Sequence, residues 1–247
     1  MRAILTAEGE TGLVREFFGA RTGYFVDVGA NQPDDESQTL HLEKLGWTGV
    51  LIEPQPDLAE ELRRCSQAKV YAVACSAPEN AGQSMRLQVA GKYSSLNSEL
   101  VDLLATPSRT IDVPVKTLDQ VLLDAQAPSP IDFLSIDVER HELEVVRGFE
   151  FERWQPRLIL IEDHVLDLRL HDYLVSHDYR WIRRTGLNGW YVPKRDARPL
   201  GFFGRWQFIR KYHLGVPTRR LRQVSRRIRR RLGLLRPSAG RARHPEQ

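Results

Sequence analysis

Short apolar runs alternate with amphipathic stretches over residues 20–195, and this alternation predicts strands and helices in turn. The runs are apolar along nearly their whole length, which is typical of strands whose sheet is covered on both faces. In one intervening stretch, Leu58, Leu62 and Cys65 follow at spacings of four and three and therefore share a helix face. Strands are expected at residues 24–28, 50–52, 70–74, 132–136 and 158–161. Helices are expected at residues 34–45, 56–65, 117–125, 142–149 and 165–176.

Two further pairs of runs indicate antiparallel strands. Residues 85–89 and 111–115 form an expected insertion, and residues 179–183 and 190–192 flank the turn sequence TGLNG of an expected terminal hairpin. Strands that alternate with helices of about ten residues form a mostly parallel α/β sheet. Ligands of such sheets bind beyond the carboxyl ends of the strands, near the point where the strand order reverses. The residues that follow each strand are therefore the candidates for a site.

Polar side chains follow nearly every predicted strand. The first strand is followed by the sequence DVGAN and the second by an acid, the third by ACS, the fourth by DVERHE and the fifth by EDH. The candidates are Asp27, Gly29, Asn31, Glu53, Ala74, Cys75, Ser76, Asp137, Glu139, His141, Glu142, Glu162, Asp163 and His164. Because an acid buried without a partner is costly, this convergence indicates a ligand with hydroxyl groups or a metal.

Gly29 and Glu53 have the spacing of a ribose-binding pair. A Gly after the first strand lets the backbone approach a ligand closely, and an acid 24 residues later can accept both ribose hydroxyls. The GxGxxG phosphate cradle is missing, and the acids at 34–36 would repel a pyrophosphate. S-adenosylmethionine has ribose hydroxyls, an ammonium and a sulfonium but no phosphate, so the residues favour it over a nicotinamide dinucleotide. The alternative is a plain strand-to-helix turn with an Asp cap.

Five motifs in order resemble the FkbM-type methyltransferases. They are FVDVGANQPDDESQTLHLEKLGWTGVLIEPQPDLAEEL, VYAVACS, VPVKTLDQVL, IDFLSIDVERHELEVVRGF and PRLILIEDH, which together cover about residues 22–165. The resemblance implies a Rossmann-like class I methyltransferase fold, with a mostly parallel seven-stranded sheet and an antiparallel last strand. It also implies an S-adenosylmethionine-dependent enzyme that O-methylates a hydroxyl of a sugar, glycolipid or related natural product. A bacterial-type protein is expected.

The resemblance implies a role for each end of the cofactor site. The methionine end would meet Asp27, Gly29 and Asn31, the ribose would meet Glu53, and the adenine would meet Ala74 and Cys75. Asp137 would lie closest to the transferring methyl group. The family usually has Gly where this chain has Arg140. If that Gly serves a positive φ or a close approach of substrate, Arg140 changes the acceptor pocket.

Methyl transfer to a hydroxyl also needs a group that takes the proton. We expect Asp137, His141 or Glu139 to do so, because an imidazole titrates near neutral pH and an Asp at the end of a buried strand rarely serves structure alone. The alternative for His141 is a tether at a helix start, bonded to backbone or to Glu139. Glu142 is expected as a first-turn carboxylate of a helix, and Glu162 and His164 as a solvated strand end. Asp137, Glu139 and Glu162 could hold a divalent metal, but no compact ligand motif supports one, so none is predicted.

Composition narrows the class of protein. The 247 residues are 41% hydrophobic and 28% charged, which is ordinary for a globular protein. No apolar run approaches the roughly 18–20 residues that span a bilayer, and the first residues do not resemble a secretory signal. The two cysteines, Cys65 and Cys75, match no zinc spacing and are expected as core residues. These features predict a cytoplasmic protein.

Charge divides the chain into two parts. Residues 1–200 carry 22 Lys and Arg against 31 Asp and Glu, whereas residues 201–247 carry 14 against one. We therefore expect a methyltransferase domain at 1–198 and a basic amphipathic extension at 199–247. Within the extension, Leu221, Val224, Ile228 and Leu232 follow at spacings of three and four, which predicts a helix with an apolar stripe among arginines.

The basic extension predicts an anionic partner. Aromatic residues precede the striped helix, so residues 205–236 are expected to contact an anionic membrane, which would place the protein at the inner face of the membrane. A nucleic acid is the weaker alternative, and a solvated tail is the third. Two other functions therefore remain open beside O-methylation of a saccharide or lipid-linked acceptor. One is an RNA methyltransferase that uses the tail, and the other is a non-catalytic binding protein of the same fold.

Overall fold

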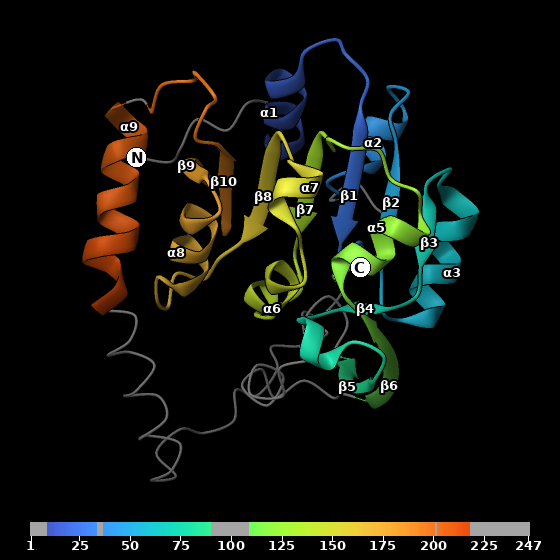
Figure 1. Cartoon of the computed structure of the whole chain (residues 1–247). Helices are drawn as coiled ribbons and strands as arrows, with labels where there is room; N and C mark the ends of the chain where they lie inside the picture. The colour runs from blue at the N-terminus through green and yellow to red at the C-terminus, as the bar shows by residue number, and fades with distance from the viewer. Residues whose placement is uncertain (1–8, 34–36, 90–108, 201, 218–247) are drawn as a thin grey trace, which may run out of the picture.

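The computed structural model describes residues 9–33, 37–89, 109–200 and 202–217, and a seven-stranded sheet runs through its centre (Figure 1). The strand order is β3-β2-β1-β7-β8-β10-β9. The strands are β1 (Tyr24–Val28), β2 (Thr48–Ile52), β3 (Lys69–Tyr71), β7 (Phe133–Ile136), β8 (Leu158–Glu162), β9 (Tyr179–Thr185) and β10 (Asn188–Pro193).

Five of these strands pair in parallel, and β9 runs in the same direction as they do. β10 runs antiparallel to both of its neighbours, β8 and β9. This confirms the predicted mostly parallel α/β sheet with an antiparallel last strand. The strand order reverses between β1 and β7, which places the expected ligand crevice at the carboxyl ends of these two strands.

Helices cover both faces of the sheet because successive strand residues point to opposite sides. Phe25 packs toward α1 (Gly9–Phe18), α2 (Leu40–Glu43) and α3 (Pro56–Cys65). Its neighbour Val26 packs toward α5 (Leu118–Asp124), α6 (Glu142–Arg147), α7 (Phe151–Trp154) and α8 (Arg169–Ser176). Both residues are fully buried, and each belongs to a separate apolar core. The two-sided core explains why the strands carry almost no exposed polar positions.

A second, three-stranded sheet lies beyond the carboxyl end of β1 (Figure 1). Its central strand, β6 (Arg109–Lys116), pairs antiparallel with β5 (Ser84–Val89), which confirms the predicted inserted pair. β6 also pairs with the short strand β4 (Ala74–Cys75), and the single turn η1 (Pro78–Asn80) follows. The single strand expected at 70–74 is therefore wrong, because the chain leaves the large sheet after Tyr71 and enters the small one at Ala74.

Several helix bounds differ from the expected ones. The helix expected from residue 34 begins at Leu40, and residues 34–36 lie outside the described part of the chain. The helix expected at 142–149 ends at Arg147, and its C-cap is Gly148, where a Cβ would lie 2.4 Å from the carbonyl oxygen of Ser76. The helix expected from residue 165 begins at Arg169. Helices α1 and α7 were not predicted.

The C-terminal part of the described chain packs on the edge strand β9. It consists of α9 (Phe202–Phe208) and a π-helical turn (Ile209–Leu214). The side-chain amide of Gln207 donates to the carbonyl of Arg184 and accepts from its amide, and Tyr212 is buried in the core. Residues 202–217 therefore pack against the seven-stranded sheet. The striped helix expected around 221–232 lies outside the described residues, and the domain division at 198 stays a prediction.

The described helices are short. None of them is long and apolar enough to cross a membrane.

Candidate active site

The carboxyl ends of β1 and β7 are held together at the point where the strand order reverses. The amide of Asp137 donates to the carbonyl of Val28 at 2.9 Å. Gly29 adopts a φ of +87°, and a Cβ built on it would lie 1.8 Å from the carbonyl oxygen of Asp137. The close approach that the sequence predicts for Gly29 is therefore, in this structure, an approach of the Asp137 backbone. Gly29 therefore helps to fix the position of Asp137 at the carboxyl end of β7.

Asp27 is a buried carboxylate on β1 with fixed partners. Its Oδ2 accepts a hydrogen bond from the Thr39 hydroxyl at 2.7 Å, and Ser135 on β7 provides a second hydrogen bond. Burial raises the pKa of Asp27 to about 6, while these two hydrogen bonds act in the opposite direction. The bond from Thr39 also explains why α2 begins only at the next residue.

Glu53, at the end of β2, ties two loops together. Its Oε2 accepts from the backbone amide of Asn31 at 3.0 Å, and its Oε1 accepts from the amide of Gln55 at 2.9 Å. The residue is 3% exposed, and burial raises its pKa. Each carboxylate oxygen can accept more than one hydrogen bond, so Glu53 can still bind hydroxyl groups. Asn31 holds its amide in place with a φ of +54°, a conformation that Asn adopts more readily than most residues.

The loop after β7 carries most of the predicted catalytic residues in a strained turn. Glu139 and Arg140 have φ values of +54° and +74°. A left-handed conformation costs a residue other than Gly roughly 1–2 kcal/mol. Oε1 of Glu142 holds the turn by accepting from the amides of Arg140 at 2.9 Å and Val138 at 3.4 Å. Position 140, where the family resemblance has Gly, is thus a positive-φ position that this chain fills with Arg.

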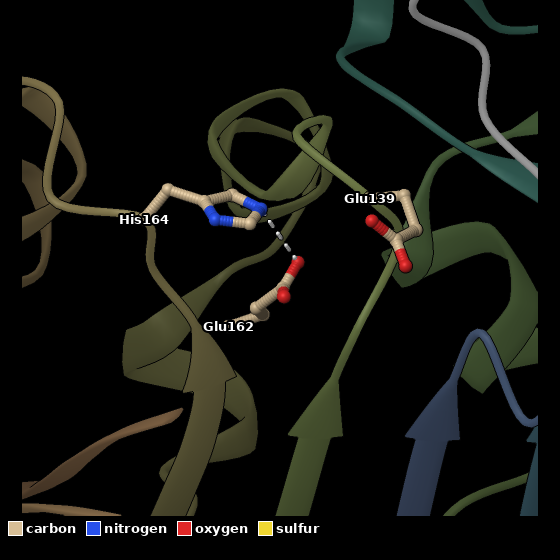
Figure 2. Close-up of side chains that lie close together, drawn as sticks. All are labelled: Glu139, Glu162 and His164. Carbon is tan, nitrogen blue, oxygen red and sulfur yellow. Dashed lines mark ion pairs between the residues drawn. The ribbon is translucent and has the colours of Figure 1, made fainter. Parts of the chain in front are cut away.

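Four carboxylates meet where this loop faces the end of β8. Glu142 and Glu162 are nearly fully buried, and Asp137 and Glu139 lie beside them. Burial is the largest cause that raises the pKa of three of these acids, and the charge of Glu162 is the second. The pKa rises to about 8 for Asp137, to about 8 for Glu142 and to about 7 for Glu139. Figure 2 shows Glu139 and Glu162 with His164, and the three side chains point toward a common space.

His141 lies at the start of α6, on the side of the small sheet. Its Nε2 is 3.0 Å from Oγ of Ser76, which also accepts from the amide nitrogen of Asn80 at 2.9 Å. The tether is therefore Ser76 and not Glu139. Burial lowers the pKa of His141, so its imidazole is neutral near pH 7 and can accept a proton.

Ala74 and Cys75, the residues expected beside the adenine, form β4 and are 3% exposed each. Burial raises the pKa of Cys75 to about 12, so its thiol stays protonated and serves as a small apolar wall.

The structure brings together most of the predicted residues. Asp27, Gly29, Glu53 and Asp137 lie at the ends of three adjacent strands, and Asn31 is bonded to Glu53. Two partners were not predicted, namely Thr39 and Glu10. Glu10 on α1 accepts from Asn188 at 2.7 Å and from Gln38 at 3.0 Å, and its charge contributes to the raised pKa of Asp137. No local motif marks these two residues, because their contacts are made across the fold.

The raised pKa values predict how stability depends on pH. Asp137, Glu139 and Glu142 all bind protons more tightly in the folded protein than in the unfolded chain. Their contribution to stability is therefore greatest in acid, and the free energy of unfolding falls as the pH rises from about 5 to about 8. The free energy of unfolding in urea, measured with a chelator present at about pH 6 and about pH 8.5, checks this. Equal values at the two pH values would contradict the raised pKa values of these carboxylates.

Comparisons with known proteins give a family. The chain matches the methyltransferase FkbM domain over residues 27–181. It is similar to the solved structure of methyltransferase FkbM from Methylobacillus flagellatus KT, with 18% identity and a TM-score of 0.45 over 69% of this chain and 43% of that one. It is also similar to precorrin-6y C5,15-methyltransferase from Geobacter metallireducens GS-15, with 12% identity and a TM-score of 0.40 over 78% of this chain and 90% of that one.

No curated protein matches the chain. The similarity also spans less than half of the Methylobacillus protein. The family assignment rests on the domain match. This match covers more than half of the chain and includes every predicted site residue from Asp27 to His141. The chain therefore belongs to the FkbM methyltransferase family.

Proposed function

We propose that the chain is an S-adenosylmethionine-dependent O-methyltransferase whose acceptor is a hydroxyl of a sugar, glycolipid or related natural product. The observation that supports this most is the row of acids at the ends of β1, β2 and β7, in which Asp27 and Glu53 are buried and Asp137 is exposed. A positively charged cofactor without phosphate suits such a row, whereas a pyrophosphate would be repelled by it.

The residues present fit each part of this cofactor. Glu53 has acceptor capacity left for the two ribose hydroxyls, in addition to the amides that it already binds. Asp27 and Asp137 are carboxylates beside which an ammonium and a sulfonium would be favourable. Ala74 and Cys75 are 3% exposed each, so they would back the adenine as an apolar wall and contact it only through the little surface left open. Gly29 and Asn31 hold the loop between these parts.

Methyl transfer to a hydroxyl requires the protein to supply a base. When bound, S-adenosylmethionine supplies a methyl group on a sulfonium, and the C–S bond breaks with its electron pair going to sulfur as the O–C bond to the acceptor forms. The hydroxyl proton must then go to a base. We assign this role to Asp137, because its ionised carboxylate, with a pKa raised to about 8, is a stronger base than that of an ordinary Asp, and the positive charge of a bound S-adenosylmethionine would favour this ionised form. Glu139, on the same loop, orients the acceptor hydroxyl, and neutral His141 is the second candidate base.

Replacement of Glu53 tests the cofactor site. Glu53→Ala removes a charged acceptor whose hydrogen bonds are worth roughly 1.5–3 kcal/mol each, so the affinity for S-adenosylmethionine should fall by about 10- to 150-fold. Titration calorimetry measures this. Glu43→Ala is the matched control, because Glu43 also ties a loop by accepting from the amide of Gln67, at 3.1 Å, but lies on α2. Wild-type affinity in a folded Glu53→Ala variant would remove Glu53 from the site.

We further propose that α9 and the start of the π-helical turn after it contact an anionic membrane. Phe202, Trp206 and Ile209 follow at spacings of four and three and are 89%, 51% and 47% exposed. Arg205 and Arg210 lie beside them and are also exposed. An apolar face edged by basic residues suits a lipid surface. Nucleic acid is disfavoured because a phosphate backbone does not need the apolar side chains.

Liposome binding tests this surface. Trp206→Ser together with Ile209→Ser should reduce binding to vesicles that contain anionic phosphatidylglycerol, because each change removes burial worth roughly 1.5–3 kcal/mol at most. Leu187→Ser is the matched control, since Leu187 is similarly exposed, at 49%, in the turn between β9 and β10. Binding by the wild type should weaken with salt without vanishing, because the apolar contribution is not screened. Equal binding by the double variant and the control would contradict a role for α9.

A further inference from the structure

Three side chains with metal-ligating atoms converge where the loop after β7 faces the end of β8 (Figure 2). Glu139, Glu162 and His164 each place one such atom within 4.8 Å of the other two, and Nε2 of His164 is 3.4 Å from Oε2 of Glu162. Ligand atoms that are about 2.0–2.2 Å from one ion lie at most about 4.4 Å apart. A small adjustment of the side chains therefore lets all three bind one ion.

The surroundings of the Glu162 side chain favour a bound cation. Its side chain is only 7% exposed, and its Oε2 has no hydrogen-bond partner among the described residues. The same holds for Nε2 of His164 within the described part of the chain, although the two atoms face each other. A separation of 3.4 Å is long for a hydrogen bond between them. A buried carboxylate oxygen that lacks a hydrogen-bond donor and faces an imidazole nitrogen only across a long ion pair is an arrangement that a cation can complete.

A second group of acids meets Glu162 from the other side. Asp137 and Glu142 also place a carboxylate oxygen within 4.8 Å of Glu162. Glu142 is already engaged, because its Oε1 accepts from the amides of Val138 and Arg140 and holds the turn. The group with the imidazole is therefore the better ligand set, and Asp137 flanks it.

We propose that Glu139, Glu162 and His164 bind one divalent cation. Two carboxylates balance its charge, and oxygen ligands with one imidazole suit Mn²⁺, with Mg²⁺ as the alternative ion. Three protein ligands leave coordination positions for water or for an acceptor. Resting on the proposed function, the cation would bind the acceptor hydroxyl and lower its pKa, so that the proton passes more readily to Asp137.

A titration of the full chain with Mn²⁺ tests the proposal. The protein is first treated with chelator, and free Mn²⁺ is then followed by its electron paramagnetic resonance signal. We expect one saturable site, with Mg²⁺ as a competitor. Glu162→Gln and His164→Ala should each weaken Mn²⁺ binding at least roughly tenfold, since even partners of metal ligands cost about 10- to 100-fold. Glu144→Gln should bind as the wild type does, because Glu144 is a half-buried carboxylate of α6 that pairs with Arg147 outside the cluster.

The outcomes separate this proposal from the proposed function. Circular dichroism establishes that each variant is folded, and His164, which is 24% exposed, tolerates replacement if Glu162→Gln does not fold. Absence of saturable Mn²⁺ binding, or wild-type affinity in a folded His164→Ala variant, would overturn the cation site. Binding of Mn²⁺ without binding of S-adenosylmethionine in calorimetry would support the cation site and overturn the proposed function. Binding of S-adenosylmethionine without binding of Mn²⁺ would support the proposed function and overturn the cation site.

Discussion

Gly29→Ala is expected to destabilise the protein by about 2–5 kcal/mol, since a left-handed φ costs Ala about 1–2 kcal/mol and overpacking adds about 1–3 kcal/mol. The new Cβ would lie 1.8 Å from the carbonyl oxygen of Asp137, and this atom belongs to the backbone at a strand end and cannot rotate away. The register between β1 and β7 would have to change, and with it the position of the Asp137 carboxylate. The free energy of unfolding in urea measures the loss.

Gly82 provides the control for this experiment. Its φ of +78° is close to the +87° of Gly29, but a Cβ added there meets no described atom within 4 Å. Gly82→Ala should therefore cost only about 1 kcal/mol, the conformational penalty less the reduced entropy of the unfolded chain. Equal losses for the two variants would mean that Gly29 is needed for its φ alone and not for the approach of β7.

Asp137→Asn is expected to lower the turnover by about 10²–10⁴-fold, with a much smaller loss of affinity for S-adenosylmethionine because the carboxylates of Asp27 and Glu53 remain. The amide keeps the shape of the side chain but cannot take the hydroxyl proton. Release of S-adenosylhomocysteine measures turnover, and calorimetry measures affinity. Asp119→Asn is the matched control, because Asp119 is a half-buried carboxylate that accepts from Trp154 at 2.8 Å and lies on α5.

His141→Ala decides between the two candidate bases. If Asp137 takes the proton, His141→Ala should keep most of the turnover, because His141 is bonded to Ser76 on the side of the small sheet. A large loss in His141→Ala together with normal turnover in Asp137→Asn would exchange their roles. Near-normal turnover in both variants would contradict the assignment of a side-chain base.

The sheet could be predicted from the sequence because its central strands are short and almost entirely apolar. The run TGLNG marks the turn of the last hairpin, and β9 and β10 form around it as expected. The break between β3 and β4 could not be predicted, since residues 71–75 read as one apolar run. Helix α1 carried a signal that was not used, because Leu13, Val14, Phe17 and Phe18 repeat at helical spacing and pack on the core.

The site was predictable where it follows from the strand ends and unpredictable where it depends on loops. Asp27, Glu53 and Asp137 are adjacent because β2, β1 and β7 are adjacent. The cluster of Glu139, Glu162 and His164 depends on the left-handed turn at Glu139, which no residue type at that position announces. A search for compact ligand motifs fails here because 23 residues of sequence separate Glu139 from Glu162.

Transfer of a labelled methyl group tests the central claim most directly. The full chain is incubated with S-adenosylmethionine that carries a deuterated methyl group and with a bacterial cell extract, which is then separated into saccharide, lipid, RNA and protein fractions. We expect the label in an O-methyl ether of the saccharide or lipid fraction, and its loss with Asp137→Asn. Label in RNA would establish the alternative acceptor. S-adenosylmethionine that binds without giving up its methyl group to any fraction would contradict the account and make the chain a binding protein.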